Sequence, residues 1–379
     1  MNILLAPDSF KGSLEAFEVC QAMKNGIQKV LPYANFTFLP LADGGEGTLN
    51  IIHDNIENSE MIHCQCHDAY QNLKETEFCL FNENNALIES AKIIGLTMVD
   101  KEKRNILKAS SIGVGELIIE ALNHHCKNIY ISLGGSSTND AGFGMATALG
   151  VKFLDENKQE LIPIPNNLLY IHSIDTSHID ARIKDTNIIV LCDVDTPFIG
   201  KNGSTYTYGP QKGGNAVQLD FLENSFKHLI RILNEHRVYT NENLPGSGAA
   251  GGIGFMLNSI FNAKLLSGID TILDILNAHE KLKGIDIVFT GEGRMDYQTV
   301  CGKVPVGIAK LASKNGIPTV AVAGYLGQGA NKVFEHSISA FESCIYAPST
   351  VGEAILNAKE NASFAAERLI RAILVGLKL

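Results

Sequence analysis

Short apolar segments alternate with helical patterns near both ends of the chain. In the stretch 13–30, apolar residues recur at helical spacing, and Ser13 is the expected N-cap. The stretch 352–377 has the pattern of a closing amphipathic helix. Strands are predicted at 2–6, 36–41, 285–290, 317–323 and 338–346. Strands this apolar, alternating with helices, are typical of a parallel sheet that is covered on both faces.

The middle of the chain has a different pattern. Residues 60–90 alternate between apolar and polar positions, which favours antiparallel strands. Further elements are predicted as helices at 113–125, 219–236 and 268–280 and as strands at 128–133 and 187–192. We therefore predict an α/β fold with two α/β domains. Residues 1–62 and 284–379 would form a Rossmann-like parallel-sheet domain, and residues 63–283 would form an inserted mixed α/β domain.

The composition narrows the class of protein. The chain of 379 residues is longer than one typical core, which agrees with two domains. Its formal net charge of −10 disfavours nucleic acid and anionic membranes as partners, because like charges repel. No apolar run reaches the roughly 18 residues of a membrane span, and the start MNILLAPDSFKG lacks the pattern of a signal peptide. We therefore expect a cytoplasmic protein.

The stretch YISLGGSSTNDAGFG, residues 130–144, begins as a strand and continues into small and polar residues. A helix from Ala141 onward would add the positive end of its dipole to an anion site. The candidate phosphate ligands of this loop are Gly134, Gly135, Ser136, Ser137 and Thr138. The loop is not a Walker motif, because Asn139 and Asp140 stand where that motif has lysine and a hydroxyl residue. On these residues alone, a phosphate loop and a capped turn are equally good interpretations.

Carboxylates follow three other predicted strands. They are Asp43 and Glu46 in ADGGEGT, Asp193 and Asp195 in DVDTP, and Glu292 and Asp296 in GEGRMD, which Lys303 follows. Carboxylates at strand ends can bind Mg²⁺ together with substrate phosphates. One of them could instead accept the proton of an attacking hydroxyl. At each position alone, a capping or turn residue is the alternative interpretation.

Basic and glycine-rich loops could supply further contacts to an anion. Lys11 in APDSFKGS and Lys212 in GPQKGG could bind a carboxylate or a phosphate, although each could also be a solvated surface lysine. The segment PGSGAAGGIGF at 245–255 contains Gly248 and Gly251. It would form either an anion-binding turn or a close contact between helices.

The segment HCQCH at 63–67 has residue types that bind zinc. On a strand, however, the histidines would face one side and Cys64 and Cys66 the other. We therefore predict a strand with buried cysteines rather than a metal site.

Seven loops stand in a fixed order along the chain: APDSFKGS, LADGGEGT, LGGSSTNDAG, CDVDTPFIG, GPQKG, PGSGAAGG and TGEGRMDYQTVCGK. This series resembles the motifs of the bacterial class I glycerate kinase family. The resemblance implies transfer of the γ-phosphoryl group of ATP to D-glycerate with Mg²⁺ as cofactor. It implies 2-phosphoglycerate as the product, with 3-phosphoglycerate as the alternative, and two α/β domains with the active site between them.

The resemblance also carries residue roles. Catalysis is assigned to Asp193, Asp296 and Lys11, with Asp193 favoured as the proton acceptor. Substrate binding is assigned to Asp8, Ser9, Lys11, Asn139 and Asp140. ATP binding is assigned to Gly134, Gly135, Ser136, Ser137, Thr138, Lys212, Gly248, Gly251 and Lys303, and Mg²⁺ binding to Asp43, Glu46, Asp195 and Glu292.

Two other classes of protein share part of this pattern. A dinucleotide-dependent dehydrogenase would have the same α/β rhythm, but the first strand leads into PDSFKGS rather than GxGxxG. A sugar-acid sensor without ATP turnover would share the ligand site, but the sequence has no basic patch for DNA. Small molecules are therefore the expected partners, and a homodimer remains open.

Overall fold

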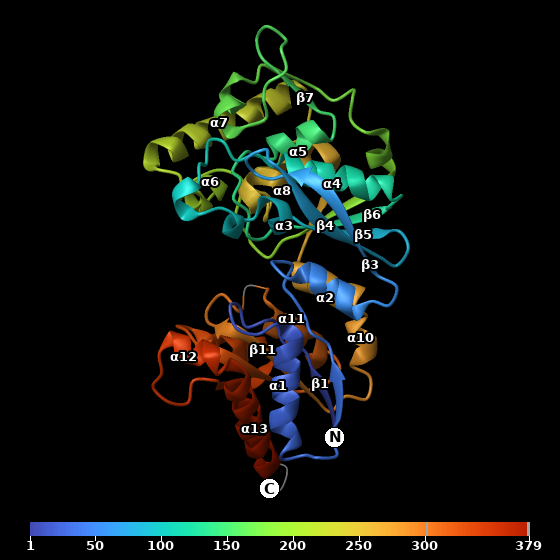
Figure 1. Cartoon of the computed structure of the whole chain (residues 1–379), viewed down its shortest axis with the longest axis vertical. Helices are drawn as coiled ribbons and strands as arrows, with labels where there is room; N and C mark the ends of the chain where they lie inside the picture. Colours follow the sequence, from blue (N-terminus) through green and yellow to red (C-terminus); the bar gives the residue numbers. More distant parts are fainter. Residues whose placement is uncertain (301, 377–379) are drawn as a thin grey trace. The chain divides into compact units, whose positions relative to one another are not determined.

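The computed structural model describes residues 1–300 and 302–376 (Figure 1). The chain divides into two compact units, unit 1 with Met1–Asp43 and Gly268–Leu379, and unit 2 with Gly44–Ser267. These divisions lie nearer the N-terminus than those predicted at 62/63 and 283/284. The reason is packing, because α2 (Thr48–Asn55) contacts strands of unit 2, whereas α9 (Gly268–Ile275) contacts a helix of unit 1.

Unit 1 contains a sheet of five parallel strands in the order β13-β12-β11-β1-β2. The strands are β1 (Asn2–Leu5), β2 (Asn35–Phe38), β11 (Ile287–Met295), β12 (Thr319–Leu326) and β13 (Ile338–Ser343). The chain passes from β1 to the edge strand β2, and its later strands are added on the other side of β1. The order therefore reverses between β1 and β11. In doubly wound sheets, ligands bind beyond the carboxyl ends of the strands at such a reversal.

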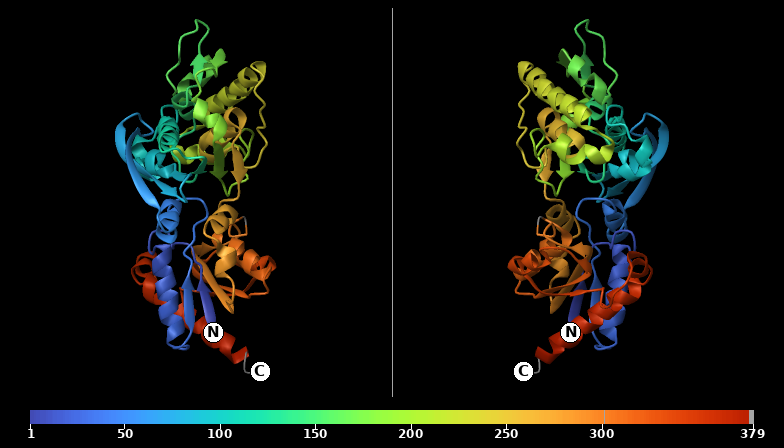
Figure 2. Two further views of the ribbon diagram at one scale, coloured as in Figure 1. Left: turned by 90° about the vertical axis from the view of Figure 1, so that its right-hand side faces the viewer. Right: turned by 90° about the vertical axis from the view of Figure 1, so that its left-hand side faces the viewer.

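Helices cover both faces of this sheet. They are α1 (Ala16–Gln28), α9, α10 (Ala278–Lys281), α11 (Val304–Ser313), η6 (Ala330–His336), α12 (Val351–Leu356) and α13 (Ala358–Gly376). Val320 and Val322 of β12 pack in one apolar cluster with α1 and α13, whereas Ala321 and Ala323 pack in another with α11 and η6. Alternate residues of one strand thus face opposite layers. Figures 1 and 2 show the start of β1 and the end of α13 at the same end of this unit.

Unit 2 contains a mixed sheet of six strands in the order β10-β9-β6-β5-β4-β3. Its strands are β3 (Glu60–His67), β4 (Leu73–Phe81), β5 (Asn85–Glu89), β6 (Asn128–Ser132), β9 (Asn187–Leu191) and β10 (Lys264–Leu266). The pairs from β5 to β10 are parallel, and β3 and β4 run antiparallel to their neighbours. A separate antiparallel ribbon joins β7 (Lys152–Leu154) to β8 (Ser173–Asp175).

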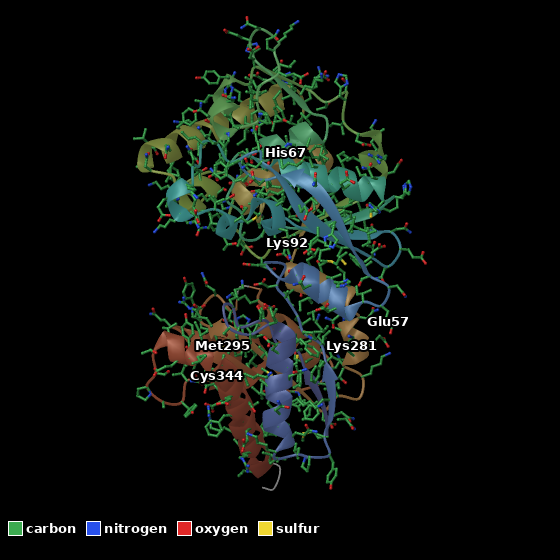
Figure 3. The ribbon with its side chains drawn as sticks, in the orientation of Figure 1. Glu57, His67, Lys92, Lys281, Met295 and Cys344 are labelled. Atoms are coloured by element: carbon green, nitrogen blue, oxygen red, sulfur yellow. The ribbon has the colours of Figure 1, made fainter. Side chains whose placement is uncertain are left out.

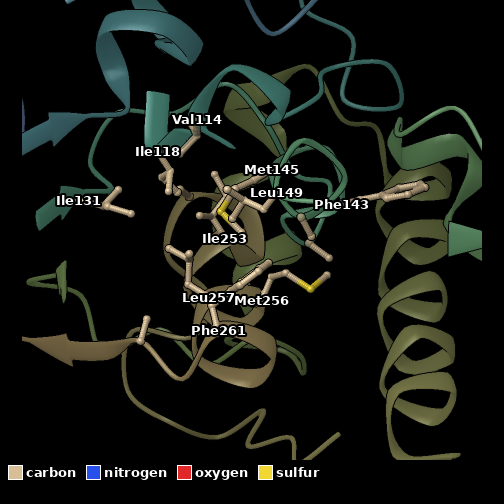
Figure 4. Close-up of a cluster of buried hydrophobic side chains, with 14 of the residues drawn as sticks. Val114, Ile118, Ile131, Phe143, Met145, Leu149, Ile253, Met256, Leu257 and Phe261 are labelled. Atoms are coloured by element: carbon tan, nitrogen blue, oxygen red, sulfur yellow. The ribbon is translucent and has the colours of Figure 1, made fainter. Parts of the chain in front are cut away.

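The helices of unit 2 bury a large apolar core. The α-helices are α2, α3 (Ala91–Ile94), α4 (Ile112–Asn123), α5 (Phe143–Ala148), α6 (Ser204–Tyr208), α7 (Ala216–Glu235) and α8 (Ala249–Phe261). Short 3₁₀ helices are η1 (Leu96–Met98), η2 (Lys101–Lys103), η3 (Pro165–Tyr170), η4 (Ala181–Asp185) and η5 (Pro210–Lys212). Ile131 of β6 packs in one buried cluster with Ile118 of α4, Met145 of α5 and Leu257 of α8 (Figure 4).

The predicted fold class is confirmed, because a parallel-sheet unit built from both chain ends holds an inserted mixed α/β unit. Local details differ from the sequence prediction. The N-cap of α1 is Glu15, which forms a capping box with Glu18, so Ser13 as N-cap was wrong. The closing helix is divided at Asn357 into α12 and α13. Within the described residues, no helix is long and apolar enough to cross a membrane.

Candidate active site

A cavity of about 730 Å³ lies at the carboxyl edge of the sheet of unit 1. Its lining comes from the segments that follow β1, β2 and β13, from the ends of β11 and β12, and from α12. The ionisable side chains among the described lining residues are Asp8, Lys11, Asp43, Glu292, Arg294 and Lys303, with Cys344 at the opposite side. Sequence analysis had placed five of these residues in separate loops as ligand candidates, and the fold brings them to one cavity.

The strand reversal explains why acidic residues meet here. Asp8 follows β1 and Glu292 lies in β11, the two strands between which the order reverses. The backbone N–H of Asp8 donates to the carbonyl of Gly291 at 2.8 Å, which fixes the two segments side by side. A side chain at Gly324 in β12 would meet the carbonyl oxygen of Gly293 at 2.4 Å, so the neighbouring strand can approach this closely only with glycine.

Three carboxylates, Asp8, Asp43 and Glu292, line this cavity, and the environment of Asp8 and Glu292 disfavours their ionisation. Burial, followed by the charge of Asp43, raises the pKa of Asp8 to about 7. The nearby Lys11 and a 2.6 Å bond from the backbone N–H of Ser9 oppose this rise. Burial also raises the pKa of Glu292, against the effect of Lys303. A cation bound beside these carboxylates would therefore stabilise their ionised form.

Glu292, Lys303 and Asp296, all predicted site residues, have defined partners. The ammonium of Lys303 donates to Glu292 at 3.2 Å, and the hydroxyl of Thr299 donates to the other oxygen of that carboxylate at 2.6 Å. Burial alone would lower the pKa of Lys303, but the charge of Glu292 raises it overall. Asp296 is buried and pairs with Arg294 at 2.6 Å. Asp296 is not among the described residues that line the cavity.

The donor set of this cavity fits Mg²⁺. In the described part of the chain, no three histidine, cysteine or acidic side chains form a ready metal-binding group. Mg²⁺, however, usually takes one or two carboxylates and completes its shell with water and substrate phosphates. Asp43 and Glu292, both of which raise the pKa of Asp8, can serve as those carboxylates. The predicted ligands Glu46 and Asp195 belong to unit 2 and are exposed.

In the loop that follows β6 in unit 2, the hydroxyl groups form hydrogen bonds with other residues of the same unit. Ser137 donates to the carbonyl of Ile94 at 2.9 Å, and Thr138 donates to the carbonyl of Ala250 at 3.4 Å. Ser136 accepts from Lys212 at 3.1 Å. All three hydroxyl residues are buried, whereas Gly135 is exposed and Gly134 is half-buried. Of this predicted phosphate site, the glycine backbone is therefore the part that a ligand can reach.

Asp140 anchors the start of α5. Its carboxylate accepts from the backbone N–H and the hydroxyl of Ser111, both at 2.8 Å, and from the N–H groups of Gly142 and Gly144, both at 3.1 Å. Burial raises the pKa of Asp140, although these bonds oppose the rise. Asn139 is also buried and connects to Thr205 of α6 at 3.1 Å. These contacts favour the capped-turn interpretation for this part of the loop.

Lys212 lies inside unit 2 rather than on its surface. Its ammonium donates to the carbonyl of Thr138 at 2.6 Å as well as to Ser136. Burial lowers the pKa of Lys212 to about 7, although the charge of Asp140 opposes this effect. The buried ammonium of Lys212 therefore stabilises the conformation of the 134–140 loop from the interior of unit 2.

The glycine-rich segment before α8 packs against the same loop. Gly251 has a φ of +72°, and a side chain there would meet the carbonyl oxygen of Thr138 at 2.2 Å. The N–H of Gly248 donates to the carbonyl of Thr196 at 3.0 Å. This brings the segment beside the loop after β9, in which Asp193 is half-buried. The close-packing interpretation of these two glycines therefore has direct support.

Two residues that the sequence analysis did not select hold the GGEG turn in unit 2. Glu89 is 1% exposed, and its carboxylate accepts from the N–H groups of Gly47 and Leu49 at 3.1 Å each, at the start of α2. Ser132 donates to the carbonyls of Gly44 and Gly45. Their position at the carboxyl ends of β5 and β6 is the signal that could have identified them.

The HCQCH segment forms the C-terminal part of β3, so the predicted strand is confirmed, but of its two cysteines only Cys66 is buried and Cys64 is half-buried. His67 pairs with Glu116 of α4 at 2.6 Å, and Lys92 pairs with Glu77 of β4 at 2.9 Å; Figure 3 labels His67 and Lys92 at separate places in unit 2. The sulfur atoms of Cys64 and Cys66 lie 3.9 Å apart as thiols. Among the described residues nothing completes a metal site here.

Comparisons with known proteins agree with this architecture. Residues 3–374 match the model of the glycerate kinase family. The chain is 41% identical over 355 residues to a glycerate kinase of Halalkalibacterium halodurans, with 93% of each chain covered. It is 36% identical over 378 residues to the glycerate 2-kinase of Escherichia coli K12, covering 100% of this chain and 99% of the relative. A crystal structure described as a candidate glycerate kinase 2 of Salmonella typhimurium LT2 has 36% identity and a TM-score of 0.86, with both chains covered to 100%.

These similarities first define the class of protein, which is a kinase. More narrowly, the chain belongs to the glycerate kinase family. The resemblance that was inferred from seven loops is therefore confirmed over almost the whole chain.

Proposed function

We propose that this protein transfers the γ-phosphoryl group of ATP to D-glycerate and yields 2-phosphoglycerate. The observation that carries the proposal is the cavity of unit 1, where carboxylates and cations meet at the strand reversal of a chain in the glycerate kinase family. The choice of product is supported by the name of the E. coli relative, glycerate 2-kinase. The alternative product is 3-phosphoglycerate.

The residues of unit 1 divide the chemistry of phosphoryl transfer between them. Asp43 and Glu292 would hold Mg²⁺, which neutralises the charge on the donor phosphates when it is bound. Lys11 is exposed at the cavity and would pair with the carboxylate of glycerate, with Asp8 and Ser9 beside it. Lys303, held by Glu292, would neutralise charge on the transferred group. Positioning and charge neutralisation are what this reaction mainly requires.

The proton acceptor stays a prediction of the sequence. Asp193 is the first choice and Asp296 the second, and the pairing of Asp296 with Arg294 favours a positioning role for Asp296. Asp193→Asn should lower kcat by orders of magnitude and leave ATP binding nearly unchanged. A near-normal kcat would remove Asp193 from this role. That both units contribute to one active site also stays a prediction.

One coupled assay tests the proposed function. ADP release is measured with ATP and Mg²⁺, with and without D-glycerate, and ³¹P NMR identifies the product. We expect ADP release that depends on D-glycerate and a resonance of 2-phosphoglycerate. A 3-phosphoglycerate resonance would contradict the proposed product but leave the proposed kinase activity in place. Absence of glycerate-dependent ADP release would contradict the proposed activity itself. In a parallel mixture of D-glycerate and NAD⁺ without ATP, reduction of the cofactor would indicate the dehydrogenase instead.

A further inference from the structure

The cavity of unit 1 has two chemically different sides. The charged side is formed by residues after β1 and β2, by β11 and by Lys303. The other side is formed by the end of β12, the segment after β13, α12 and the first residue of α13, and apart from Ser349 and Thr350 its groups are apolar. Its apolar members are Tyr325, Cys344, Ile345, Val351, Ala354, Ile355 and Ala358. Figure 3 marks Cys344, which stands just after β13 at this side.

The apolar side is exposed to an extent that packing does not explain. Val351 is 77% exposed, Ile355 is 45% exposed and Tyr325 is 46% exposed, although all three line the cavity. None of the six residues of α12, all of them described, is buried. The helix is instead stabilised at its start by a capping box between Thr350 and Glu353. A concentrated apolar surface at a cavity usually indicates a ligand.

The size of the cavity indicates how large that ligand is. A volume of about 730 Å³ is in the range typical of sites for drug-sized molecules. Glycerate is a three-carbon acid with no apolar part, so it would fill only a small share of this volume and would leave the apolar side uncovered. The second substrate of a kinase is larger, and it has a flat apolar end and a polyanionic end.

Tyr325 provides a surface for a flat group. The guanidinium of Arg294 lies 5.7 Å from the centre of the Tyr325 ring and is itself held by Asp296 at 2.6 Å. This contact orients a half-exposed aromatic ring at the cavity. Stacking on such a ring is a common way for proteins to bind a base.

We propose that the apolar side of this cavity, formed by Tyr325, Ile345, Val351 and Ile355, binds the nucleobase and ribose of the phosphate donor. The inference rests on the proposed kinase function and adds the place of the donor. It directs the phosphates toward Lys11, Lys303 and the carboxylates that would hold Mg²⁺. It also assigns the nucleoside to residues of unit 1, whereas sequence analysis had assigned most of the ATP contacts to residues of unit 2.

Substitutions on α12 separate this role from a structural one. The double variant Val351→Ser/Ile355→Ser removes two apolar groups without adding charge. Leu356→Ser is the matched control, because Leu356 is 83% exposed on the same helix and is not among the described residues that line the cavity. These positions are exposed, so all variants should fold, and thermal unfolding confirms this.

Isothermal titration calorimetry then measures the binding of three probes to each variant: Mg²⁺–ADP, Mg²⁺–tripolyphosphate and D-glycerate. We expect the double variant to bind ADP roughly 10-fold or more weakly, which corresponds to about 1.4 kcal/mol. Its affinity for tripolyphosphate and glycerate should change by less than about two-fold, as should the ADP affinity of Leu356→Ser.

Two results would overturn the inference. Unchanged ADP affinity in the double variant would show that the nucleoside binds elsewhere. Weaker glycerate binding with normal ADP binding would assign the apolar side to the acid. Failure of the proposed function has a different signature, because the wild type would then lack glycerate-dependent ADP release while ADP binding still depended on Val351 and Ile355.

Discussion

The cavity of unit 1 and the 134–140 loop of unit 2 both contain polar residues that follow parallel strands. In the cavity these residues line a space for a ligand, whereas in the loop they bond to their own unit. In unit 1, Asp8, Asp43 and Glu292 line a cavity of about 730 Å³. In unit 2, the residues of the 134–140 loop are mostly buried and hydrogen-bonded to their own unit. Both segments contain the residue types of a ligand site. The difference teaches that the partners of a polar group, rather than its type, decide between binding and structure.

The comparison is clearest for the two buried aspartates. Asp140 accepts four hydrogen bonds from neighbours in the fold. Among the described residues, the Asp8 carboxylate accepts only from the backbone N–H and the hydroxyl of Ser9, and it lies beside two further carboxylates that raise its pKa. A protein retains such unfavourable crowding of charge where a bound cation or substrate compensates for it.

The largest effect is expected for Glu292→Gln. This change removes the charge that holds Lys303 and that would hold Mg²⁺. We expect kcat for glycerate phosphorylation to fall on the order of 100- to 1000-fold, as when one preorganised electrostatic group is lost. Steady-state kinetics measures this, with Glu116→Gln on α4 as a control that should stay near wild type. An unchanged kcat for Glu292→Gln would contradict the assignment of the cavity.

A smaller effect, on stability, is expected for Lys212→Met. Burial lowers the pKa of Lys212 to about 7, whereas the value for the unfolded chain is 10.5. Between these pH values, the unfolded state binds a proton that the folded state does not. The contribution of Lys212 to the free energy of unfolding therefore rises with pH, by up to about 1.4 kcal/mol per pH unit.

Urea unfolding of the wild type and Lys212→Met at pH 7, 8, 9 and 10 measures that contribution. The unfolding free energy of the wild type minus that of Lys212→Met should increase as the pH rises. A difference that does not depend on pH would mean that Lys212 keeps its charge in the folded state.

The smallest effect is expected for Ser137→Ala. Its hydroxyl bonds to the carbonyl of Ile94 inside unit 2, so its loss should cost about 1 kcal/mol of stability. The KM for ATP should stay within about two-fold of wild type. If the KM for ATP rose 10-fold or more while the stability stayed unchanged, the result would instead indicate that the Ser137 hydroxyl binds a phosphate of ATP.

The roles of the charged residues stay predictions, but the structure brings several of the selected residues to one cavity. Asp43 and Glu292 were selected because they follow apolar strands, Lys11 and Lys303 because they stand in neighbouring loop motifs, and Asp8 from the family resemblance. The parallel sheet of unit 1 brings residues that follow its strands to one edge. That inference needs only the order of elements and the rule that ligands bind at the carboxyl ends of parallel strands.

The apolar side could not be predicted in the same way. Val351 and Ile355 are far from the carboxylates in sequence, and their short helix carries no motif. The strand β11 also continues to Met295, beyond the predicted end at residue 290. Glycine and charge interrupt its apolar pattern, yet its backbone still pairs with β12, as Arg294 does with Tyr325.

The internal partners of the 134–140 loop are equally hidden from local sequence. Ser137 bonds to Ile94, Thr138 to Ala250 and Ser136 to Lys212, each from a distant part of the chain. Local residue types left phosphate loop and capped turn as equal alternatives. Only long-range packing could favour the turn for the hydroxyls and for Asp140.

The unfolding free energies of Asp8→Asn and Asp140→Asn at pH 8 test the contrast between the two regions most directly. The pKa of Asp8 is about 7 in the folded protein and 3.8 in the unfolded chain. At pH 8 the carboxyl is largely ionised in both states, so the free energy of unfolding of the wild type is lowered by nearly the full cost of ionising this group in the folded state. Asp8→Asn should therefore stabilise the ligand-free protein, by at most about 4 kcal/mol. Asp140→Asn should destabilise it by about 3 kcal/mol, because the amide keeps only one acceptor oxygen and turns its own N–H donors toward buried donors. We expect this cost to exceed the gain from removing a carboxyl whose pKa is raised by burial. Destabilisation by Asp8→Asn together with a neutral Asp140→Asn would contradict the account.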